Sequence, residues 1–119
     1  MNGMKHCRTY PQTVRIRRRR EFLALQRDGR RRHTPHFVVI RRPSTGAASR
    51  LGVTVSARIG NSVVRNRVKR LVREVFRHRR ADLVPPTDVL VIAKPGASAL
   101  TYAQAATELE HVLEIVPER

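Results

Sequence analysis

The chain has 119 residues, of which 40% are hydrophobic, and this composition suits one compact domain rather than a wholly disordered chain. It carries 25 lysine and arginine residues against 9 aspartate and glutamate residues, which gives a formal net charge of +16. Because like charges repel, this excess favours a polyanionic partner, with nucleic acid first and an anionic membrane surface second.

The chain shows no features of export or membrane insertion. No apolar run approaches the roughly 20 residues that span a bilayer, and no signal-peptide pattern follows the N-terminus. The single cysteine, Cys7, excludes an internal disulfide and fits a reducing compartment. These features predict a cytoplasmic protein with no membrane partner.

The basic residues are concentrated in the first two-thirds of the chain. Between Lys5 and Arg80 lie 23 of the 25 basic residues but only three of the 9 acidic residues. From Ala81 onward the balance reverses. We therefore expect the binding surface before residue 80 and a structural scaffold after it.

The first part of the chain has two sections. Residues 1–16 have mixed composition without a clear period, which predicts a flexible N-terminal leader before a single domain of residues 17–119. Residues 17–27 are expected to form a short helix, because Phe22 and Leu25 share one side and Gly29 follows as a C-terminal cap.

Three segments have the pattern of strands. Residues 36–42 are rich in β-branched and aromatic side chains, and residues 50–56 alternate between apolar and small or polar side chains. Residues 88–94 form a continuous apolar run, which is typical of a buried strand. A turn of residues 43–49 separates the first two strands, and the second is expected to run antiparallel to the first.

Two longer helices complete the predicted order α-β-β-α-β-α, an α+β fold arranged as a small α-β sandwich. The strongest helix covers residues 61–80, and its apolar stripe consists of Val64, Val68, Leu71, Val72, Val75 and Phe76. The last covers residues 101–116, with a capping box of Thr101 and Gln104. Its core stripe is predicted to be Tyr102, Ala106, Leu109, Leu113 and Val116.

The helix of residues 61–80 has a cationic side opposite its apolar stripe. At about 100° per residue, this side carries Asn66, Lys69, Arg70, Arg73 and Arg77, with Arg65 and Arg67 on its flanks. Guanidinium groups bind phosphate in a bidentate fork, and Glu74 is the only acid in the segment. Asn61 is predicted to cap the helix, and a helix N-terminus also attracts phosphate. The pattern indicates an RNA-binding helix.

An active site within the protein itself is not expected. The five histidines (His6, His33, His36, His78 and His111) show no metal-ligand spacing, and no glycine-rich phosphate loop is present. From the residues alone, a ribosomal protein or ribosome-assembly factor remains the main alternative. A helix-turn-helix DNA-binding protein is the third.

The segment GNSVVRNRVKRLVRE (residues 60–74) resembles the signature of the bacterial ribonuclease P protein family. The similar run also includes Ser56, Arg58 and Ile59 before it. Three flanking features agree with the family pattern: REF at residues 20–22, RLG at residues 50–52 and VIAKPGAS at residues 91–98. The resemblance covers roughly residues 15–115.

This resemblance implies a fold, an activity and partners. The fold would be an α-β sandwich whose helical crossover, around the long basic helix, is left-handed and so departs from the usual hand. The holoenzyme removes the 5′ leader from precursor tRNA, with its magnesium ions in a catalytic RNA. The protein would bind no cofactor by itself, supply no catalytic or metal-ligating residue, and join the RNA one to one.

The resemblance also assigns site residues. Contacts to ribonuclease P RNA would come from Arg58, Asn61, Arg65, Asn66, Arg67, Lys69, Arg70 and Arg73. A cleft for the precursor tRNA 5′ leader, between the first helix and the sheet, would contain Arg18, Arg19, Phe22, Phe37 and Arg41. Gln26 and Ile40 stand where family members often have aromatic residues, and Ala57 where lysine is common. Leader binding would then depend more on charge, with Arg42 adding to the arginines above.

Overall fold

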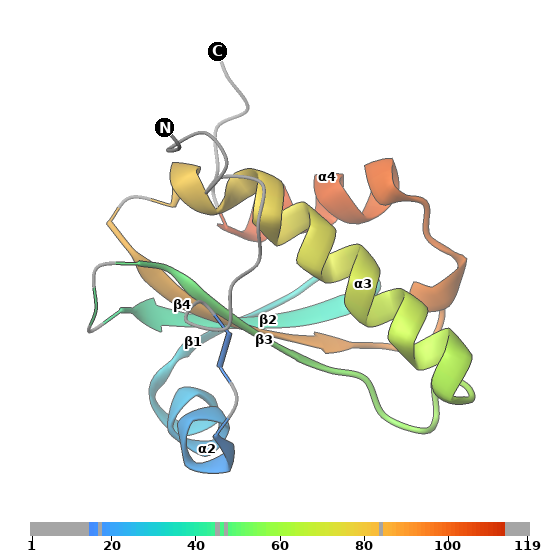
Figure 1. Cartoon of the computed structure of the whole chain (residues 1–119), viewed down its shortest axis with the longest axis horizontal. Coiled ribbons are helices and arrows are strands. Elements are labelled where there is room, and N and C mark those ends of the chain that lie inside the picture. The colour runs from blue at the N-terminus through green and yellow to red at the C-terminus, as the bar shows by residue number, and fades with distance from the viewer. Residues whose placement is uncertain (1–14, 17, 45, 47, 84, 114–119) are drawn as a thin grey trace, which may run out of the picture.

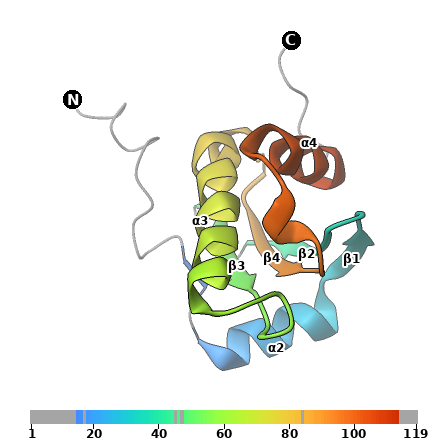
Figure 2. The ribbon, with the colours of Figure 1, turned by 90° about the vertical axis from the view of Figure 1, so that its right-hand side faces the viewer.

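The part of the chain that the structure describes, residues 15–16, 18–44, 46, 48–83 and 85–113 of a computed structural model, forms a four-stranded sheet with helices on both faces (Figure 1). Its elements are α2 (Arg19–Asp28), β1 (Arg30–His33), β2 (Phe37–Pro43), β3 (Arg50–Thr54), α3 (Ser62–Arg79), β4 (Thr87–Ala93) and α4 (Tyr102–Leu113), with short 3-10 helices η2 (Arg80–Asp82) and η3 (Ala97–Ala99). α2 covers one face of the sheet, and α3 and α4 lie together on the other (Figure 2). The α-β sandwich is confirmed.

The strands lie in the order β1-β2-β4-β3. The β1–β2 and β2–β4 pairs are antiparallel, whereas β3 and β4 are parallel neighbours joined through α3. When the sheet is viewed from the face that α3 and α4 cover, with β3 and β4 pointing up, β4 lies to the left of β3 (Figures 1 and 2). The crossover is therefore left-handed, against the usual right-handed rule.

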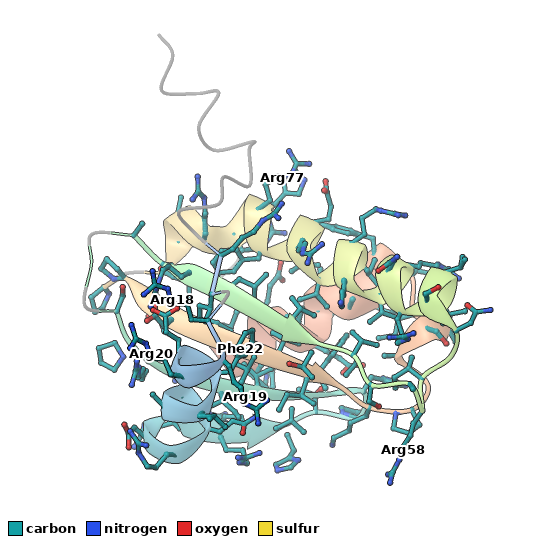
Figure 3. All side chains as sticks on the ribbon, turned by 60° about the horizontal axis from the view of Figure 1, so that its bottom comes forward. Arg18, Arg19, Arg20, Phe22, Arg58 and Arg77 are labelled. Carbon is teal, nitrogen blue, oxygen red and sulfur yellow. The ribbon has the colours of Figure 1, made fainter. Side chains whose placement is uncertain are left out.

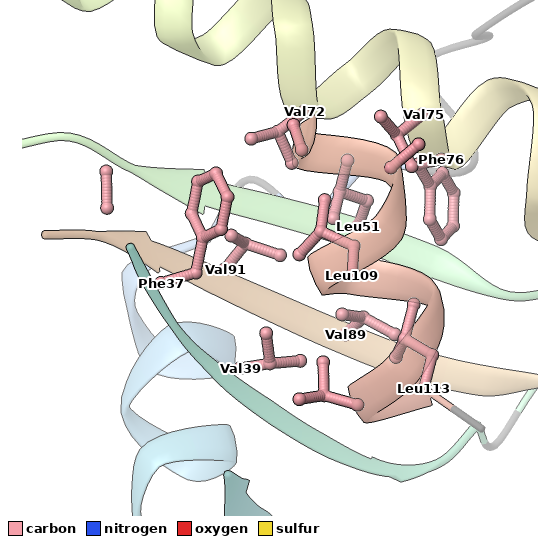
Figure 4. Close-up of a cluster of buried hydrophobic side chains, with 14 of the residues drawn as sticks. Phe37, Val39, Leu51, Val72, Val75, Phe76, Val89, Val91, Leu109 and Leu113 are labelled. Atoms are coloured by element: carbon pink, nitrogen blue, oxygen red, sulfur yellow. The ribbon is translucent and has the colours of Figure 1, made fainter. Parts of the chain in front are cut away.

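The main hydrophobic core lies between the sheet and the pair α3 and α4 (Figure 4). Phe37 and Val39 of β2 and Val89 and Val91 of β4 face it from the sheet and have at most 1% of their surface exposed. From α3 come four buried side chains of the predicted stripe: Val68, Val72, Val75 and Phe76. The predicted helix stripe is thus confirmed for these four residues, while Val64 and Leu71 are partly buried.

A second, smaller cluster fixes α2 to the opposite face. Leu25, Ile40 and Leu90 form it together with Ile16, which is only 3% exposed. The backbone N–H of Ile16 donates to the carbonyl of Leu51 at 2.9 Å. Packed structure therefore already begins at the end of the expected N-terminal leader, of which residues 1–14 lie outside the described residues.

The structure adds one strand to the predicted order. β1 consists of three arginines and a histidine, all exposed, so its sequence shows no apolar alternation. It forms because its backbone pairs with β2 along that strand's free edge. α2 begins at Arg19, two residues later than predicted. α4 is described as far as Leu113, so the prediction for Val116 lies outside the described residues.

A buried charge network connects α2 to the sheet. The Arg50 guanidinium on β3 donates to both carboxylate oxygens of Asp88 on β4, at 3.2 and 3.0 Å, and to Glu21 on α2 at 3.1 Å. Asp88 is fully buried, and its hydrogen bonds raise the pKa of Arg50. Because breaking a buried pair leaves an uncompensated charge, this network holds α2 in one position on the sheet.

A carboxylate on α4 is held by the loop before β2. Glu108 accepts from the His36 backbone N–H at 3.1 Å, and its other oxygen lies 2.5 Å from His36 Nδ1. Burial acts to raise the pKa of Glu108, but hydrogen bonds from the His36 ring, the Thr34 side chain and the His36 N–H outweigh it. The pKa of Glu108 therefore lies below its usual value.

This lowered pKa predicts an acid-dependent contribution to stability. A carboxyl whose pKa falls on folding stabilises the fold above its unfolded pKa and loses that effect as pH drops through the folded value. We expect E108Q to lower the unfolding free energy by about 1.5–3 kcal/mol at neutral pH and by much less near pH 3 (about a unit below the unfolded pKa). Urea unfolding at both pH values measures this, and an equal difference at both would contradict it.

Candidate nucleic-acid interface

The start of α3 is fixed by its own sequence. Asn61 has extended backbone angles, and its side-chain Oδ1 accepts from the Val64 N–H at 3.0 Å, which confirms the predicted N-cap. Gly60 packs closely beneath this turn, because a Cβ there would lie 2.9 Å from the Val64 side chain. The first turn contains no acidic residue. The positive end of the helix dipole is therefore open to an anion.

Four cations at this end of α3 have no partner within the described part of the chain. Their side chains form no hydrogen bond or ion pair with any described residue, and we call these four residues the α3 cation row: Arg58, Arg67, Lys69 and Arg70. Asn66 is exposed beside them. Arg65 is half-buried and donates from Nε to the Gly60 carbonyl at 3.2 Å, while Arg73 is also partly buried.

The last turns of α3 differ, because acids occupy their cations. Glu74 binds Arg77, and its Oε2 lies 3.0 Å from His78 Nε2. Arg77 lies at the opposite end of α3 from Arg58 (Figure 3). The hydrogen bond from Arg77 is the main reason that the pKa of Glu74 is lowered. Arg79 is paired with Glu110 of α4. The free positive charge of α3 is therefore concentrated in its N-terminal half.

On the opposite side of the molecule, the α2 face of the sheet is built from three rows of paired residues. The first row is Arg42, Asp88 and Arg50; the second is Arg31, Ile40, Leu90 and Gly52; the third is His33, Val38, Ile92 and Thr54. α2 covers the apolar part of the second row. The third, which we call the open row, presents half-buried Val38 and Ile92 between exposed His33 and Thr54.

Phe22 stands at the border between α2 and this face. Its ring packs on Gly52, where a Cβ would lie only 2.7 Å from Cε1, so this close approach requires glycine. The side chain remains partly exposed. Arg18 and Arg19 are exposed at the start of the helix (Figure 3). Arg18, Arg19 and Phe22 therefore lie together around the first turn of α2.

Phe37 and Arg41, the other two residues assigned to the leader cleft, lie on the wrong face for it. Phe37 is fully buried in the main core, and the Arg41 guanidinium donates to the carbonyl of Leu113 in α4 at 3.1 Å. Side chains alternate along a strand, so positions 37, 39 and 41 all face α3 and α4. Arg42 does lie on the α2 face, where its Nη1 is 3.7 Å from Oδ2 of Asp28.

Sequence reasoning also missed residues that the α2 face does contain. Val38, Ile92 and His33 were not assigned to any site, although they form most of the open row. The alternation of β2 shows that residues 38, 40 and 42 share a face. Which of the two faces receives α2 depends on tertiary packing, so the local pattern gave no signal for it.

The described residues contain neither a membrane-spanning helix nor a metal-binding cluster. No helix there is long and apolar enough to cross a membrane. No group of three or more histidine, cysteine, aspartate or glutamate side chains is arranged to hold a metal ion in the same part of the chain.

The fold and this surface define a small cationic α-β sandwich with a left-handed crossover and a basic helix. A family model described as Ribonuclease P matches residues 10–116. The ribonuclease P protein component of Desulfovibrio desulfuricans is 48% identical over 83% of this chain and 79% of its own length. That of Desulfatibacillum aliphaticivorans is 40% identical over 92% and 93%.

Solved structures agree. A mutant Staphylococcus aureus RNase P protein with defective mRNA degradation activity has a TM-score of 0.79 at 33% identity, covering 87% of this chain and 88% of that one. The Thermotoga maritima RNase P protein has a TM-score of 0.76 at 30% identity, covering 87% and 98%. The chain belongs to the bacterial ribonuclease P protein family. It is thus a protein component of a tRNA-processing ribonucleoprotein, and its partner is ribonuclease P RNA.

Proposed function

We propose that the protein docks on ribonuclease P RNA through the N-terminal half of α3. The observation that carries this is the α3 cation row, whose four side chains have no acidic partner among the described residues. Cations left unpaired on a rigid helix repel one another and are neutralised by RNA phosphates. Asn61, Arg65, Asn66 and Arg73 lie on or beside this surface and complete the predicted RNA-binding set.

The precursor tRNA 5′ leader would cross the α2 face of the sheet. Phe22 and the open row offer partly exposed apolar surface on which unpaired bases can rest. Arg18 and Arg19 at one edge, and Arg31 and His33 at another, provide positive charge for its phosphates. The path is therefore separate from the docking helix, because the sheet lies between them.

The chemistry itself would belong to the RNA. The cationic surfaces suit binding and positioning, and Glu74 and Glu110 beside α3 are already paired with arginines or histidine. In this proposal the protein contributes no catalytic group, the RNA-containing holoenzyme holds the magnesium ions, and one protein joins each RNA in the cytoplasm.

By binding the 5′ leader, the protein would raise affinity for precursor over mature tRNA.

Reconstitution tests the proposal. The protein is mixed with ribonuclease P RNA from the same organism and a precursor tRNA, at low magnesium where the RNA alone is nearly inert. We expect leader cleavage that neither component gives alone, and the same RNA at high magnesium should cleave without protein. Cleavage by the protein alone would contradict an RNA catalytic centre, and no stimulation by a folded protein would contradict the proposed role.

A further inference from the structure

The start of α4 carries an exposed aromatic side chain beside the α3 cation row. Tyr102 was predicted to belong to the core stripe of its helix, yet 37% of its surface is exposed. Among the described residues the other large exposed apolar side chains, Leu23 and Val63, are aliphatic. An exposed tyrosine beside arginines is a combination typical of nucleic-acid-binding surfaces, where the ring stacks on a base and the arginines bind phosphate.

Tyr102 lines a hollow between α3 and α4. The hollow measures about 320 Å³ and is bounded by Arg67, Arg70, Leu71, Glu74 and Tyr102. It therefore combines one aromatic ring and one aliphatic side chain with two guanidinium groups. Arg67 and Arg70 belong to the α3 cation row, so the hollow is continuous with the proposed docking surface.

The first turn of α4, which carries the ring, is held in place by hydrogen bonds within the protein. Thr101 and Gln104 form a reciprocal capping box, with the Thr101 N–H donating to Gln104 at 2.9 Å and the Gln104 N–H donating to Thr101 at 3.2 Å. The His78 ring meets Tyr102 edge-on, with centroids 6.2 Å apart. A ring on an ordered backbone with one ring contact already made loses less freedom when a base stacks on it.

The charges around the hollow favour an anionic ligand. Glu74 is the one acid in its lining, but Arg77 and His78 both bind that carboxylate. Arg67 and Arg70 have no such partner among the described residues. Burial raises the pKa of Tyr102, so the phenol is neutral at physiological pH and does not repel phosphate.

We propose that this hollow binds one unpaired nucleobase of ribonuclease P RNA, stacked on Tyr102, while Arg67 and Arg70 bind the adjacent phosphates. The inference rests on the proposed docking of α3 and names a contact from a second helix. It makes α4 part of the RNA-binding surface, although the C-terminal third of the sequence is otherwise acidic scaffold. A docked strand would thus be held on two elements rather than one.

Three substitutions of Tyr102 distinguish base stacking on the ring from a nonspecific apolar contact. Y102A and Y102L should each weaken binding to ribonuclease P RNA by about 5- to 150-fold, the effect of losing one base stack, whereas Y102F should stay within about 2-fold because its ring still stacks. L23A, which removes an exposed apolar residue on α2, serves as the control and should bind as wild type. Wild-type affinity in Y102A and Y102L, with thermal unfolding showing folded proteins, would overturn the inference.

Tyrosine fluorescence gives a second measurement, in a protein that keeps the Tyr102 ring. The sequence contains two tyrosines, Tyr10 and Tyr102, and no tryptophan, so in Y10F the emission comes from Tyr102 alone. Saturation with ribonuclease P RNA should quench it, and unchanged emission would refute stacking. If R67A/R70A keeps full affinity, the docking proposal itself fails. If R67A/R70A loses affinity while Y102A does not, only this inference fails.

Discussion

Replacing Arg65, Arg67 and Arg70 together with alanine is expected to weaken binding to ribonuclease P RNA by about 100-fold or more, because each charge-assisted contact to phosphate stabilises by about 1.5–3 kcal/mol. The fold should persist, since all three side chains lie outside the buried stripe of α3. The salt dependence should change as well. Losing three phosphate contacts lowers the slope of log affinity against log salt by about 2–3.

The matched control removes the same charge elsewhere. R30A/R31A/R32A alters three exposed arginines of β1, on the sheet edge away from α3, and changes the net charge by the same amount. It should retain most of the affinity for the RNA measured without precursor tRNA. If both triple variants lose affinity equally, total charge rather than α3 governs binding, and the docking surface is wrongly assigned.

The second large effect concerns the two phenylalanines that the sequence placed in one cleft. F37A should lower the unfolding free energy by about 3–5 kcal/mol, because it empties a fully buried position between the sheet and the helices. F22A should cost less, about 1–2 kcal/mol, since its ring is already partly exposed. Urea unfolding of the two variants measures the difference directly.

The order of the two residues should reverse for leader binding, where a change at Phe22 is expected to have the larger effect. F22A is expected to reduce the preference for precursor over mature tRNA by about 5-fold or more, the effect of losing one base stack. F37L keeps the core nearly filled and should leave that preference unchanged. A loss of leader preference in F37L with none in F22A would place the leader on the face covered by α3 and α4, contrary to the proposed path.

The sequence by itself determined α3 almost completely. Its apolar stripe, its Asn61 cap and its cationic side follow from residue spacing along one helix, and the structure confirms them. The same holds for β2, β3 and β4, whose β-branched and apolar runs mark them as strands. These features are local, because a period of 3.6 or 2 residues is set by the backbone and is visible in any short segment.

The face to which each strand residue points was decided only by tertiary structure. Alternation along β2 separates Phe37 from Val38, but packing against α2 or against α3 and α4 decides which side is core. β1 has no apolar pattern and exists because β2 offers a free edge. Tyr102 fits a core stripe by spacing alone, yet it is exposed and lines a hollow between α4 and α3. Contacts between distant segments settle these positions, and no local pattern encodes them.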